Sequence, residues 1–516
     1  MSLKKNKIYF EGIYIFFLGL ITSFCLPPYN YWIVNFITFS LLFIFLIENS
    51  QKNIKFFFFN GYIFGFGYFI SNLYWIPISL SYDKNFDFLI PFALFLIPAF
   101  LSLFYAIAFL IFKIFLKNKS IFTNILIFSL TVGLSEFTRG TILSGFPWNL
   151  IAYTFSENIQ IIQIISIIGV YAFNTILVTI FTIPSIFYLS KKKYDFLGFF
   201  LTTIICIFFL SFGHFKINNF ENLKPKILND EIKVLSTNIP IKRFYTNLDE
   251  EEILIKLINL SNPSHKTNTV FVWPEGIIPD INLKSLKYEY DYLLKNTFSK
   301  NHKIILGIND ENFEKNKKNF FNSLSIIDNE ANVIYKYYKN KLVPFGEFLP
   351  LENVLSKIGL KSLTNNYQSY SASSERKLFQ FKTDENLKIL PLICYEIIYS
   401  GKLSENNDYN FIINISEDGW FGNSIGPYQH FAHSIFRSVE YGKYTLRSAN
   451  NGISAIIDPS GGIIDILNVD NEGVISIKEF KNVNKTPFST YGNKIYFLII
   501  LLYIFLIFSF KKLKNE

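Results

Sequence analysis

The chain is poor in charged residues and in cysteine. Only 17% of its 516 residues are Asp, Glu, Lys or Arg, against about 25% in an ordinary soluble domain. Half of the residues are hydrophobic and 19% are aromatic, which excludes a disordered chain and a collagen-like chain. Three cysteines are too few for a disulfide framework, so a small disulfide-bonded scaffold is excluded as well.

The hydrophobic residues are concentrated in residues 8–213, and a short apolar block returns at 495–510. A helix needs about 20 mostly apolar residues to cross a bilayer core of about 30 Å. We therefore expect a polytopic α-helical membrane protein with about eight spans, at residues 8–27, 31–48, 56–80, 88–116, 121–138, 160–190, 195–213 and 494–510. The first two spans are short, so a re-entrant pair remains an alternative to two full crossings.

The formal net charge of +9 comes from lysines in short clusters between the apolar stretches and at both termini. Cytoplasmic loops carry an excess of Lys and Arg, so this pattern indicates membrane topology, and we expect no nucleic-acid partner. A cluster precedes the first span and follows spans two, four, six and eight: Lys4, Lys5 and Lys7; Lys52 and Lys55; Lys113, Lys117 and Lys119; Lys191, Lys192 and Lys193; Lys511, Lys512 and Lys514. Both termini are therefore expected to be cytoplasmic, and the segment between spans seven and eight should lie on the opposite side.

An acidic and a basic residue, Glu136 and Arg139, lie three positions apart near the outer end of the fifth span. Charged residues are costly inside a membrane and usually pair with one another. A structural ion pair is one explanation. A contact with lipid headgroups, or with the large segment after the seventh span, is the other.

Between the seventh and eighth spans, residues 231–483 have the composition of a soluble α/β domain. Short β-rich runs alternate there with amphipathic stretches, and about 250 residues suffice for a complete core. Strands are expected at 232–237, 269–273, 303–308, 322–327, 333–338, 390–394, 411–415 and 453–457, and helices at 251–260, 286–298 and 428–448. We divide the chain into a transmembrane domain of about seven helices (1–215), an inserted α/β domain (216–486) and a C-terminal transmembrane helix with a basic tail (487–516).

Three of the expected strands end in residues that can carry chemistry: Glu275, Lys339 and Cys394. Ligand crevices form at strand ends in such sheets, so the three ends can converge. A thiol needs a base to become a nucleophilic thiolate and a cation to stabilise the oxyanion, which Glu275 and Lys339 would supply. Each residue alone has a simpler explanation, as a core cysteine, a solvated carboxylate or an edge lysine, and spacing does not show that they meet.

Metal catalysis is a weaker hypothesis. His430 and His433 are three positions apart on an expected helix, but no third ligand has a fitting spacing. We therefore expect a structural role for the two histidines, no metal and no organic cofactor.

Together these residues resemble the carbon-nitrogen hydrolase (nitrilase) superfamily, whose Glu, Lys and Cys occur in this order. The match is nearer to a membrane-embedded branch, the apolipoprotein N-acyltransferases, and runs nearly from end to end. It rests on the eight spans and on Gly-Phe-Pro-Trp at 145–148, Trp-Pro-Glu at 273–275, Tyr-Lys-Asn-Lys-Leu-Val-Pro-Phe-Gly-Glu at 338–347, Ile-Cys-Tyr-Glu at 393–396, Ile-Gly-Pro-Tyr-Gln-His-Phe at 425–431 and Arg-Ser-Ala-Asn-Asn-Gly-Ile at 447–453. The resemblance implies that the inserted domain is a nitrilase-like α-β-β-α sandwich.

The resemblance also implies a reaction and its partners. Cys394 would take an acyl chain from a membrane phospholipid as a thioester. The α-amine of the diacylglyceryl-modified N-terminal cysteine of an apolipoprotein would then accept that chain, which is the last step of lipoprotein maturation. Glu275 would be the general base, and Lys339 would stabilise the oxyanion with help from the backbone amide of Tyr395. The setting would be the bacterial inner membrane, with the catalytic domain on the periplasmic side and the protein expected to be a monomer.

Supporting roles follow for three more residues. Glu347 matches a second family glutamate that would hold the lysine or the base. Tyr395 and Glu396 match residues that flank the nucleophile.

Some positions depart from the family pattern. Ser236 stands where Gln is common, Tyr245 falls about where a functional Trp is often found, and residues 417–421 read Glu-Asp-Gly-Trp-Phe instead of Asn-Asp-Ala-Trp-Phe. Tyr245, Asp418 and Trp420 are candidates for the substrate pocket. Plain loop structure is an equal alternative for Asp418 and Trp420.

Two other functions remain open. One is a membrane-tethered amidase or nitrilase that hydrolyses a small amide. The other is a non-catalytic polytopic scaffold or transporter with a degenerate domain. Acceptor choice separates the first from an acyltransferase, because a hydrolase would ignore an added lipopeptide amine.

Overall fold

The computed structural model describes residues 2–116, 120–245, 249–314, 317–358, 369–401, 403–404 and 406–512. The chain forms two compact units, Met1–Asn219 with Thr486–Glu516 (unit 1) and Phe220–Lys485 (unit 2). The helices expected before and after the inserted domain thus belong to one unit. Lys117, Lys119 and Lys514, which contribute to the topology argument, lie outside the described residues.

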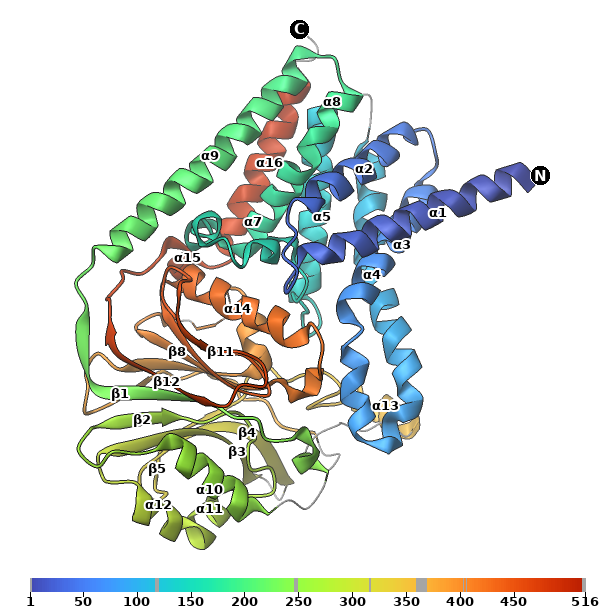
Figure 1. Ribbon diagram of the computed structural model, residues 1–516. Coiled ribbons are helices and arrows are strands. Elements are labelled where there is room, and N and C mark those ends of the chain that lie inside the picture. The colour runs from blue at the N-terminus through green and yellow to red at the C-terminus, as the bar shows by residue number, and fades with distance from the viewer. Residues whose placement is uncertain are drawn as a thin grey trace. The chain divides into compact units, whose positions relative to one another are not determined.

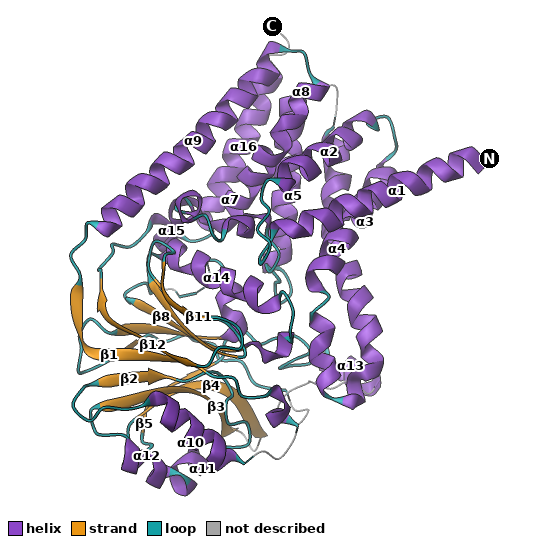
Figure 2. Cartoon of the chain, in the orientation of Figure 1, coloured by secondary structure: helices purple, strands orange, loops and turns teal. Residues whose placement is uncertain are grey.

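All regular secondary structure in the described part of unit 1 is helical, as the purple ribbons of Figure 2 show. Its α-helices are α1 (Ser2–Thr22), α2 (Val34–Glu48), α3 (Ile54–Leu73), α4 (Ile90–Phe115), α5 (Ile121–Thr141), α6 (Ile159–Ile162), α7 (Ile165–Thr182), α8 (Ile186–Leu189), α9 (Lys193–Glu221), α15 (Pro487–Tyr491) and α16 (Lys494–Lys512). Each of the eight expected apolar stretches contains a helix.

These helices differ in whether they are long enough to cross a membrane. Four apolar segments are long enough in the described residues: Lys84–Phe115, Ile121–Thr141, Ile165–Leu189 and Lys193–Glu221. A fifth is reached if α3 and the short helix Ile76–Tyr82, which meet at a bend of 44°, form one span. The other three apolar helices, Phe10–Cys25, Val34–Glu48 and Lys494–Phe510, are shorter.

Two expected spans are broken rather than continuous. The stretch 56–80 bends after α3, and the stretch 160–190 is divided among α6, α7 and α8. Within α7, Gly169 has φ 74° and ψ 166°, which interrupts the helix. A glycine tolerates this conformation because it has no Cβ.

Unit 2 contains two six-stranded sheets, labelled in Figure 1. The first has the order β12-β1-β2-β3-β4-β5 and the second the order β11-β10-β9-β8-β7-β6. The strands are β1 (Lys226–Ser236), β2 (Thr269–Val272), β3 (His302–Glu314), β4 (Lys317–Ile327), β5 (Val333–Tyr338), β6 (Phe379–Gln380), β7 (Lys388–Ile393), β8 (Phe411–Glu417), β9 (Tyr444–Asn450), β10 (Ser454–Ile457), β11 (Ile463–Leu467) and β12 (Gly473–Phe480). The sequence analysis missed β6, β11 and β12, and it placed a helix over β9.

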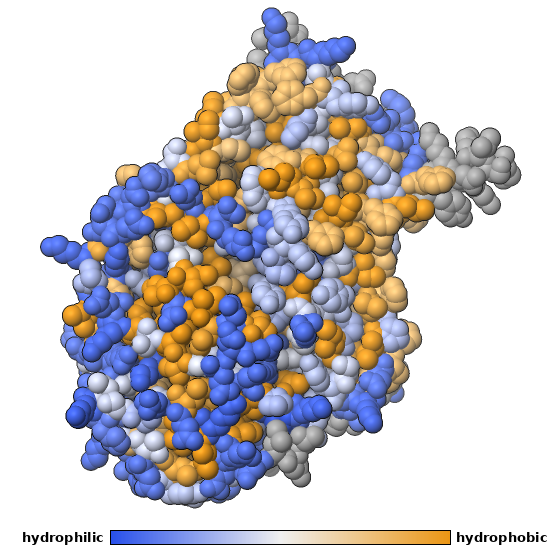
Figure 3. Space-filling view, in the orientation of Figure 1, coloured by the Kyte–Doolittle hydropathy of each residue, from blue (hydrophilic) through white to orange (hydrophobic). Residues whose placement is uncertain are grey.

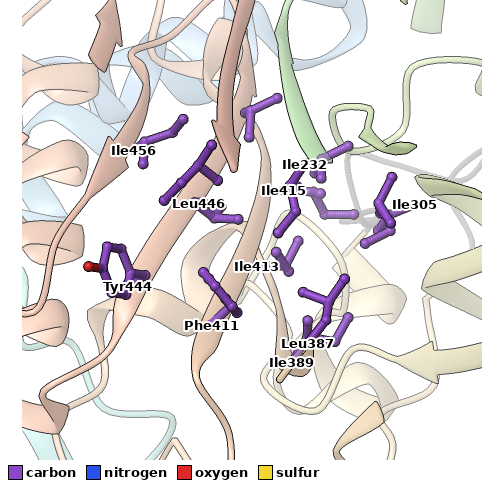
Figure 4. Close-up of a cluster of buried hydrophobic side chains, with 14 of the residues drawn as sticks. Ile232, Ile305, Leu387, Ile389, Phe411, Ile413, Ile415, Tyr444, Leu446 and Ile456 are labelled. Atoms are coloured by element: carbon purple, nitrogen blue, oxygen red, sulfur yellow. The ribbon is translucent and has the colours of Figure 1, made fainter. Parts of the chain in front are cut away.

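The hydrophobic core of unit 2 lies between the two sheets. In Figure 4, Ile232 and Ile305 of the first sheet face Ile413, Ile415 and Leu446 of the second. All seven residues of β8 are buried, as expected for a central strand covered on both faces.

Helices cover the outer faces of the sheets. A second apolar cluster joins the first sheet to α10 (Glu250–Ser261), α11 (Leu283–Glu289) and α12 (Asp291–Thr297). Helix α14 (Gly426–Tyr441) packs on the second sheet, and the short α13 (Glu352–Leu355) lies in a connection. The α-β-β-α layering matches the expectation, although the single helix expected at 286–298 is two helices.

The strand directions bring the functional residues to one edge of each sheet. Strands β1, β2 and β3 run parallel to one another, as do β7, β8 and β9. The carboxyl ends of parallel strands lie at the same edge, which is where ligand crevices form in such sheets.

Candidate active site

Glu275 lies just beyond the end of β2, with its backbone close to the neighbouring strand β3. A Cβ added to Gly307 of β3 would come within 2.5 Å of the Glu275 Cα, so only glycine permits this approach. Gly276, which follows the glutamate, has φ 53° and turns the chain away from the strand. The buried carboxylate of Glu275 is therefore placed by backbone geometry at two neighbouring positions.

Lys339 follows β5 and is fully enclosed. Its Nζ lies 3.2 Å from Glu275 Oε1 and 2.8 Å from Glu347 Oε1. Burial alone would lower the pKa of Lys339, but the two carboxylates raise it well above its ordinary value. The lysine is therefore held as an ammonium ion between two glutamates.

Glu347 is held from both ends. Its Oε2 accepts a hydrogen bond from the backbone N–H of Val343 at 2.8 Å, while Oε1 faces Lys339. Burial raises the pKa of Glu347, and the Lys339 ammonium opposes that shift.

Asn322 of β4 completes this cluster, and the sequence analysis did not single it out. Its Nδ2 donates to Glu275 Oε1 and to Glu347 Oε1, each at 2.7 Å. One amide thus bridges the two carboxylates that surround the lysine. An asparagine within an apolar strand was the available signal, but its partners lie 47 and 25 positions away.

Cys394 sits at a strained turn directly after β7. Its φ of 49° lies in the left-handed region, which is uncommon for a residue other than glycine and recurs at functional sites. Burial, and then the negative charge of Glu275, raise the pKa of the Cys394 thiol well above its ordinary value, and Lys339 opposes them. The resting thiol is therefore neutral and needs a base to become a nucleophile.

Glu396 connects the nucleophile turn to the lysine strand. Its Oε2 accepts from the Ile393 N–H at 2.9 Å, and its Oε1 accepts from the N–H groups of Asn340 at 3.0 Å and Lys341 at 3.2 Å. Arg376 and the Tyr337 hydroxyl each reach Oε1 at 2.6 Å. Burial would raise the pKa of Glu396, but the Arg376 charge and these hydrogen bonds lower it. The carboxylate therefore stays ionised and fixes the residues next to Cys394 and Lys339.

Asp418 follows β8 and is fully buried. Arg447 Nη2 lies 2.7 Å from Asp418 Oδ2, His430 Nδ1 lies 3.0 Å from Oδ1, and the Ser416 hydroxyl donates to Oδ1 at 2.7 Å. Burial raises the pKa of Cys394, and a hydrogen bond with Ser416 opposes that rise, so this network reaches the thiol. All of these partners of Asp418 are protein groups.

The other two candidate pocket residues lie together. The rings of Tyr245 and Trp420 meet edge to face at 6.3 Å, and Phe244 packs on Trp420 at 5.1 Å. Both Tyr245 and Trp420 are partly exposed. The Tyr395 ring, by contrast, is buried and packs edge to face on Tyr399 at 5.5 Å.

The described residues contain no cluster of three or more His, Cys, Asp or Glu side chains that could hold a metal ion. His430 lies against Asp418 and Arg447 rather than pairing with His433 around a shared centre.

A buried thiol beside a carboxylate, with an ammonium ion held in place, can perform acyl transfer through a thioester. In such a reaction a carboxylate takes the thiol proton and an ammonium ion stabilises the tetrahedral oxyanion. The geometry alone does not choose water or an amine as the second acceptor.

Comparison with known proteins first defines the class of unit 2. Residues 237–479 match the family model for carbon-nitrogen hydrolases. An amidase of the nitrilase superfamily from Nesterenkonia is similar over 52% of this chain and 95% of its own, at a TM-score of 0.35 and 11% identity. Unit 2 is thus a carbon-nitrogen hydrolase domain.

The comparisons then define the particular family. Residues 18–183 match the N-terminal domain of apolipoprotein N-acyltransferases. The apolipoprotein N-acyltransferase of Rickettsia prowazekii (strain Madrid E) is 34% identical over 97% of this chain and 98% of its own length. That of Rhodopseudomonas palustris is 30% identical over 89% of this chain and 87% of its own. The chain belongs to the apolipoprotein N-acyltransferase family.

Proposed function

We propose that this protein transfers an acyl chain from a membrane phospholipid to the α-amine of the diacylglyceryl-modified N-terminal cysteine of apolipoproteins. The observation that carries the proposal is the buried Lys339 ammonium, held by Glu275 and Glu347 beside a neutral Cys394 thiol. Membership of the apolipoprotein N-acyltransferase family supports the choice of an amine over water as the acceptor.

The first half-reaction loads the enzyme. Glu275 takes the thiol proton while Cys394 Sγ attacks an ester carbonyl carbon of the phospholipid. Lys339, with the backbone N–H of Tyr395, stabilises the oxyanion that forms. The ester C–O bond then breaks, Glu275 returns the proton to the departing glyceryl oxygen, and a lysophospholipid leaves behind a Cys394 thioester.

The second half-reaction transfers the acyl chain from Cys394 to the lipoprotein. The lipoprotein α-amine attacks the thioester carbonyl carbon, and Glu275 takes a proton from the nitrogen. The C–S bond breaks, the proton returns to Cys394, and an amide is formed. Glu347 and Glu396 act by holding Lys339 and the nucleophile turn, and Tyr245, Asp418 and Trp420 shape the pocket.

Both proposed substrates are lipids, which explains why the catalytic domain is joined to the apolar helices of unit 1. We propose eight spans in the bacterial inner membrane, with residues 1–215 and 487–516 as the transmembrane parts. The lysine clusters support cytoplasmic termini and a periplasmic catalytic domain at 216–486. We propose that the protein acts as a monomer, without a metal or an organic cofactor.

The decisive experiment follows the mass of the intact protein in detergent after incubation with a diacyl phospholipid, beside Cys394→Ala. A diacylglyceryl-cysteine peptide is then added. We expect an acyl adduct that hydroxylamine removes, that Cys394→Ala lacks, and that moves to the peptide amine.

Two results would contradict the proposal. An adduct that is lost to water and ignores the peptide would indicate a membrane-tethered amidase or nitrilase. No adduct on the wild-type protein with any phospholipid headgroup would favour a non-catalytic scaffold.

A further inference from the structure

A buried ion pair, Arg243–Glu417, lies next to the proposed general base. Arg243 belongs to the short helical turn Ile241–Phe244, and Glu417 ends β8. Both side chains are almost fully buried, and Arg243 Nη2 donates to Glu417 Oε2. The pair joins segments that are 174 positions apart in the sequence.

Glu417 holds one side of Glu275. The backbone N–H of Glu417 donates to Glu275 Oε2 at 3.0 Å, on the carboxylate oxygen that does not face Lys339. The Glu417 side chain in turn accepts from the Gly419 N–H and from Asn450 Nδ2, each at 2.8 Å. The backbone N–H that donates to Glu275 therefore belongs to Glu417, whose carboxylate is itself held by hydrogen bonds.

Arg243 holds the backbone that directly follows the base. Its Nε donates to the Ile277 carbonyl at 3.1 Å and its Nη2 to the Gly276 carbonyl at 3.2 Å, so it grips the two residues that follow Glu275. Its Nη1 donates to the carbonyls of Ile239 and Pro240, each at 3.3 Å. With Glu417, the guanidinium has five acceptors, which equals its number of N–H groups.

An ion pair at this depth is poorly explained as a source of stability alone. Removing two charges from water costs several kcal/mol per ion, and well-packed apolar residues often serve stability as well. The pair instead fixes the orientation of the surrounding backbone, because a planar guanidinium holds several carbonyls in one geometry.

We propose that Arg243 and Glu417 are positioning residues that hold the Glu275 carboxylate in line with the Cys394 thiol. The idea rests on the proposed function of Glu275 as the base. Lys339 and Asn322 fix Oε1, while Arg243 and Glu417 fix the turn after the base and the donor to Oε2. Arg243 and Glu417 therefore control the acylation step without touching substrate.

The test compares Arg243→Met, Glu417→Gln, the double variant and Arg243→Lys in single-turnover acylation by a phospholipid, followed by intact mass. A misplacement of about 1 Å can cost about 100-fold. We expect each single loss to slow acylation by about 10- to 100-fold at saturating phospholipid, with the half-saturating concentration unchanged. The double variant should be no slower than the slower single variant, and Arg243→Lys should recover part of the rate.

A second measurement needs no turnover. The charge of Glu275 raises the pKa of Cys394, so a displaced carboxylate should lower that pKa. The pH midpoint for alkylation of Cys394 by iodoacetamide should therefore move down in Arg243→Met and Glu417→Gln. The matched control is the exposed pair Lys256–Glu472 of the same unit, 2.7 Å apart, whose Lys256→Met and Glu472→Gln variants should behave as wild type.

The outcomes are distinguishable. A lower melting temperature with unchanged acylation and an unchanged alkylation midpoint would make the pair purely structural and overturn the proposal. A raised half-saturating phospholipid concentration at unchanged rate would place the pair at the substrate instead. If the wild-type protein forms no acyl adduct, the proposed function fails, while the alkylation midpoints still report whether the pair positions Glu275.

Discussion

A long helix of unit 1 and a central strand of unit 2 differ in how far their large apolar residues are exposed. On helix α9 of unit 1, Phe200, Ile204 and Phe208 are 63%, 60% and 53% exposed. In unit 2, by contrast, every residue of the central strand β8 is buried. Figure 3 shows orange, apolar side chains over the helices of unit 1 and far more blue over unit 2. Such a difference is expected of a chain divided between lipid and water.

The units also differ in how they use buried charge. In unit 1, Arg139 pairs with Glu136 and donates to the carbonyls of Phe146 and Asn149. These partners favour the structural ion pair over a contact with lipid headgroups. In unit 2, the buried Lys339, which follows β5, lies between two carboxylates, Glu275 and Glu347. The buried pair of unit 1 thus joins two residues of one helix, whereas Lys339 joins carboxylates 64 and 8 positions away in the sequence.

The largest effect should come from removing the central charge of unit 2. Lys339→Met takes away the oxyanion donor and leaves Glu275 and Glu347 facing each other. We expect a loss of about 1000-fold in the single-turnover rate of acylation. Lys336→Met is the matched control, because Lys336 lies on β5 three residues before Lys339 and pairs with Asp310 at 2.5 Å. Comparable losses in both variants would contradict the assignment of Lys339.

The next effect should come from the buried pair of unit 1. Arg139→Met leaves Glu136 buried without its partner, which typically costs about 3 to 5 kcal/mol. We expect a lower melting temperature of the full chain in detergent, and a smaller loss when Glu136→Gln accompanies it. A double variant as unstable as the single one would show that Arg139 acts through the carbonyls of Phe146 and Asn149 instead.

The same substitution on the two units would test the difference in solvent directly. Ile204→Lys on α9 places a charge where we propose lipid, at a cost of about 2.5 to 3.5 kcal/mol near a helix centre. Ile255→Lys on α10 of unit 2, where the isoleucine is 40% exposed, should change stability by no more than about 0.5 kcal/mol. Membrane-integrated yield and melting temperature measure both. Equal effects of the two substitutions would contradict the proposed difference in solvent between the two units.

The smallest effect concerns the pH dependence of the nucleophile. The pKa of Cys394 is raised, so its alkylation should increase with pH beyond the range of an ordinary cysteine. Glu275→Gln removes a charge that raises the pKa and should move the midpoint down by about one pH unit or more. Lys339→Met removes the opposing charge and should move it up. Peptide mass mapping separates Cys394 from Cys25 and Cys206, and shifts in the opposite directions would contradict the proposed contacts.

The sequence predicted the features that arise from local patterns. Apolar runs located the helices, alternation located most strands, and Glu275, Lys339 and Cys394 were each recognised at the end of a strand. Breaks within helices were not predicted, because Gly169 in an apolar run gives no sign of a positive φ. Strand β11 was missed too, since its residues 463–467 are an apolar run with one aspartate and no alternation.

Sequence by itself determined the two-part character of the chain, because hydrophobicity and strand or helix periodicity are properties of neighbouring residues. Only the tertiary structure decided which residues meet. Asn322 bridges two carboxylates, Glu396 joins the nucleophile turn to the lysine strand, and Arg243 reaches Glu417. These contacts depend on how strands far apart in the chain are ordered and stacked, and local sequence patterns do not record that order.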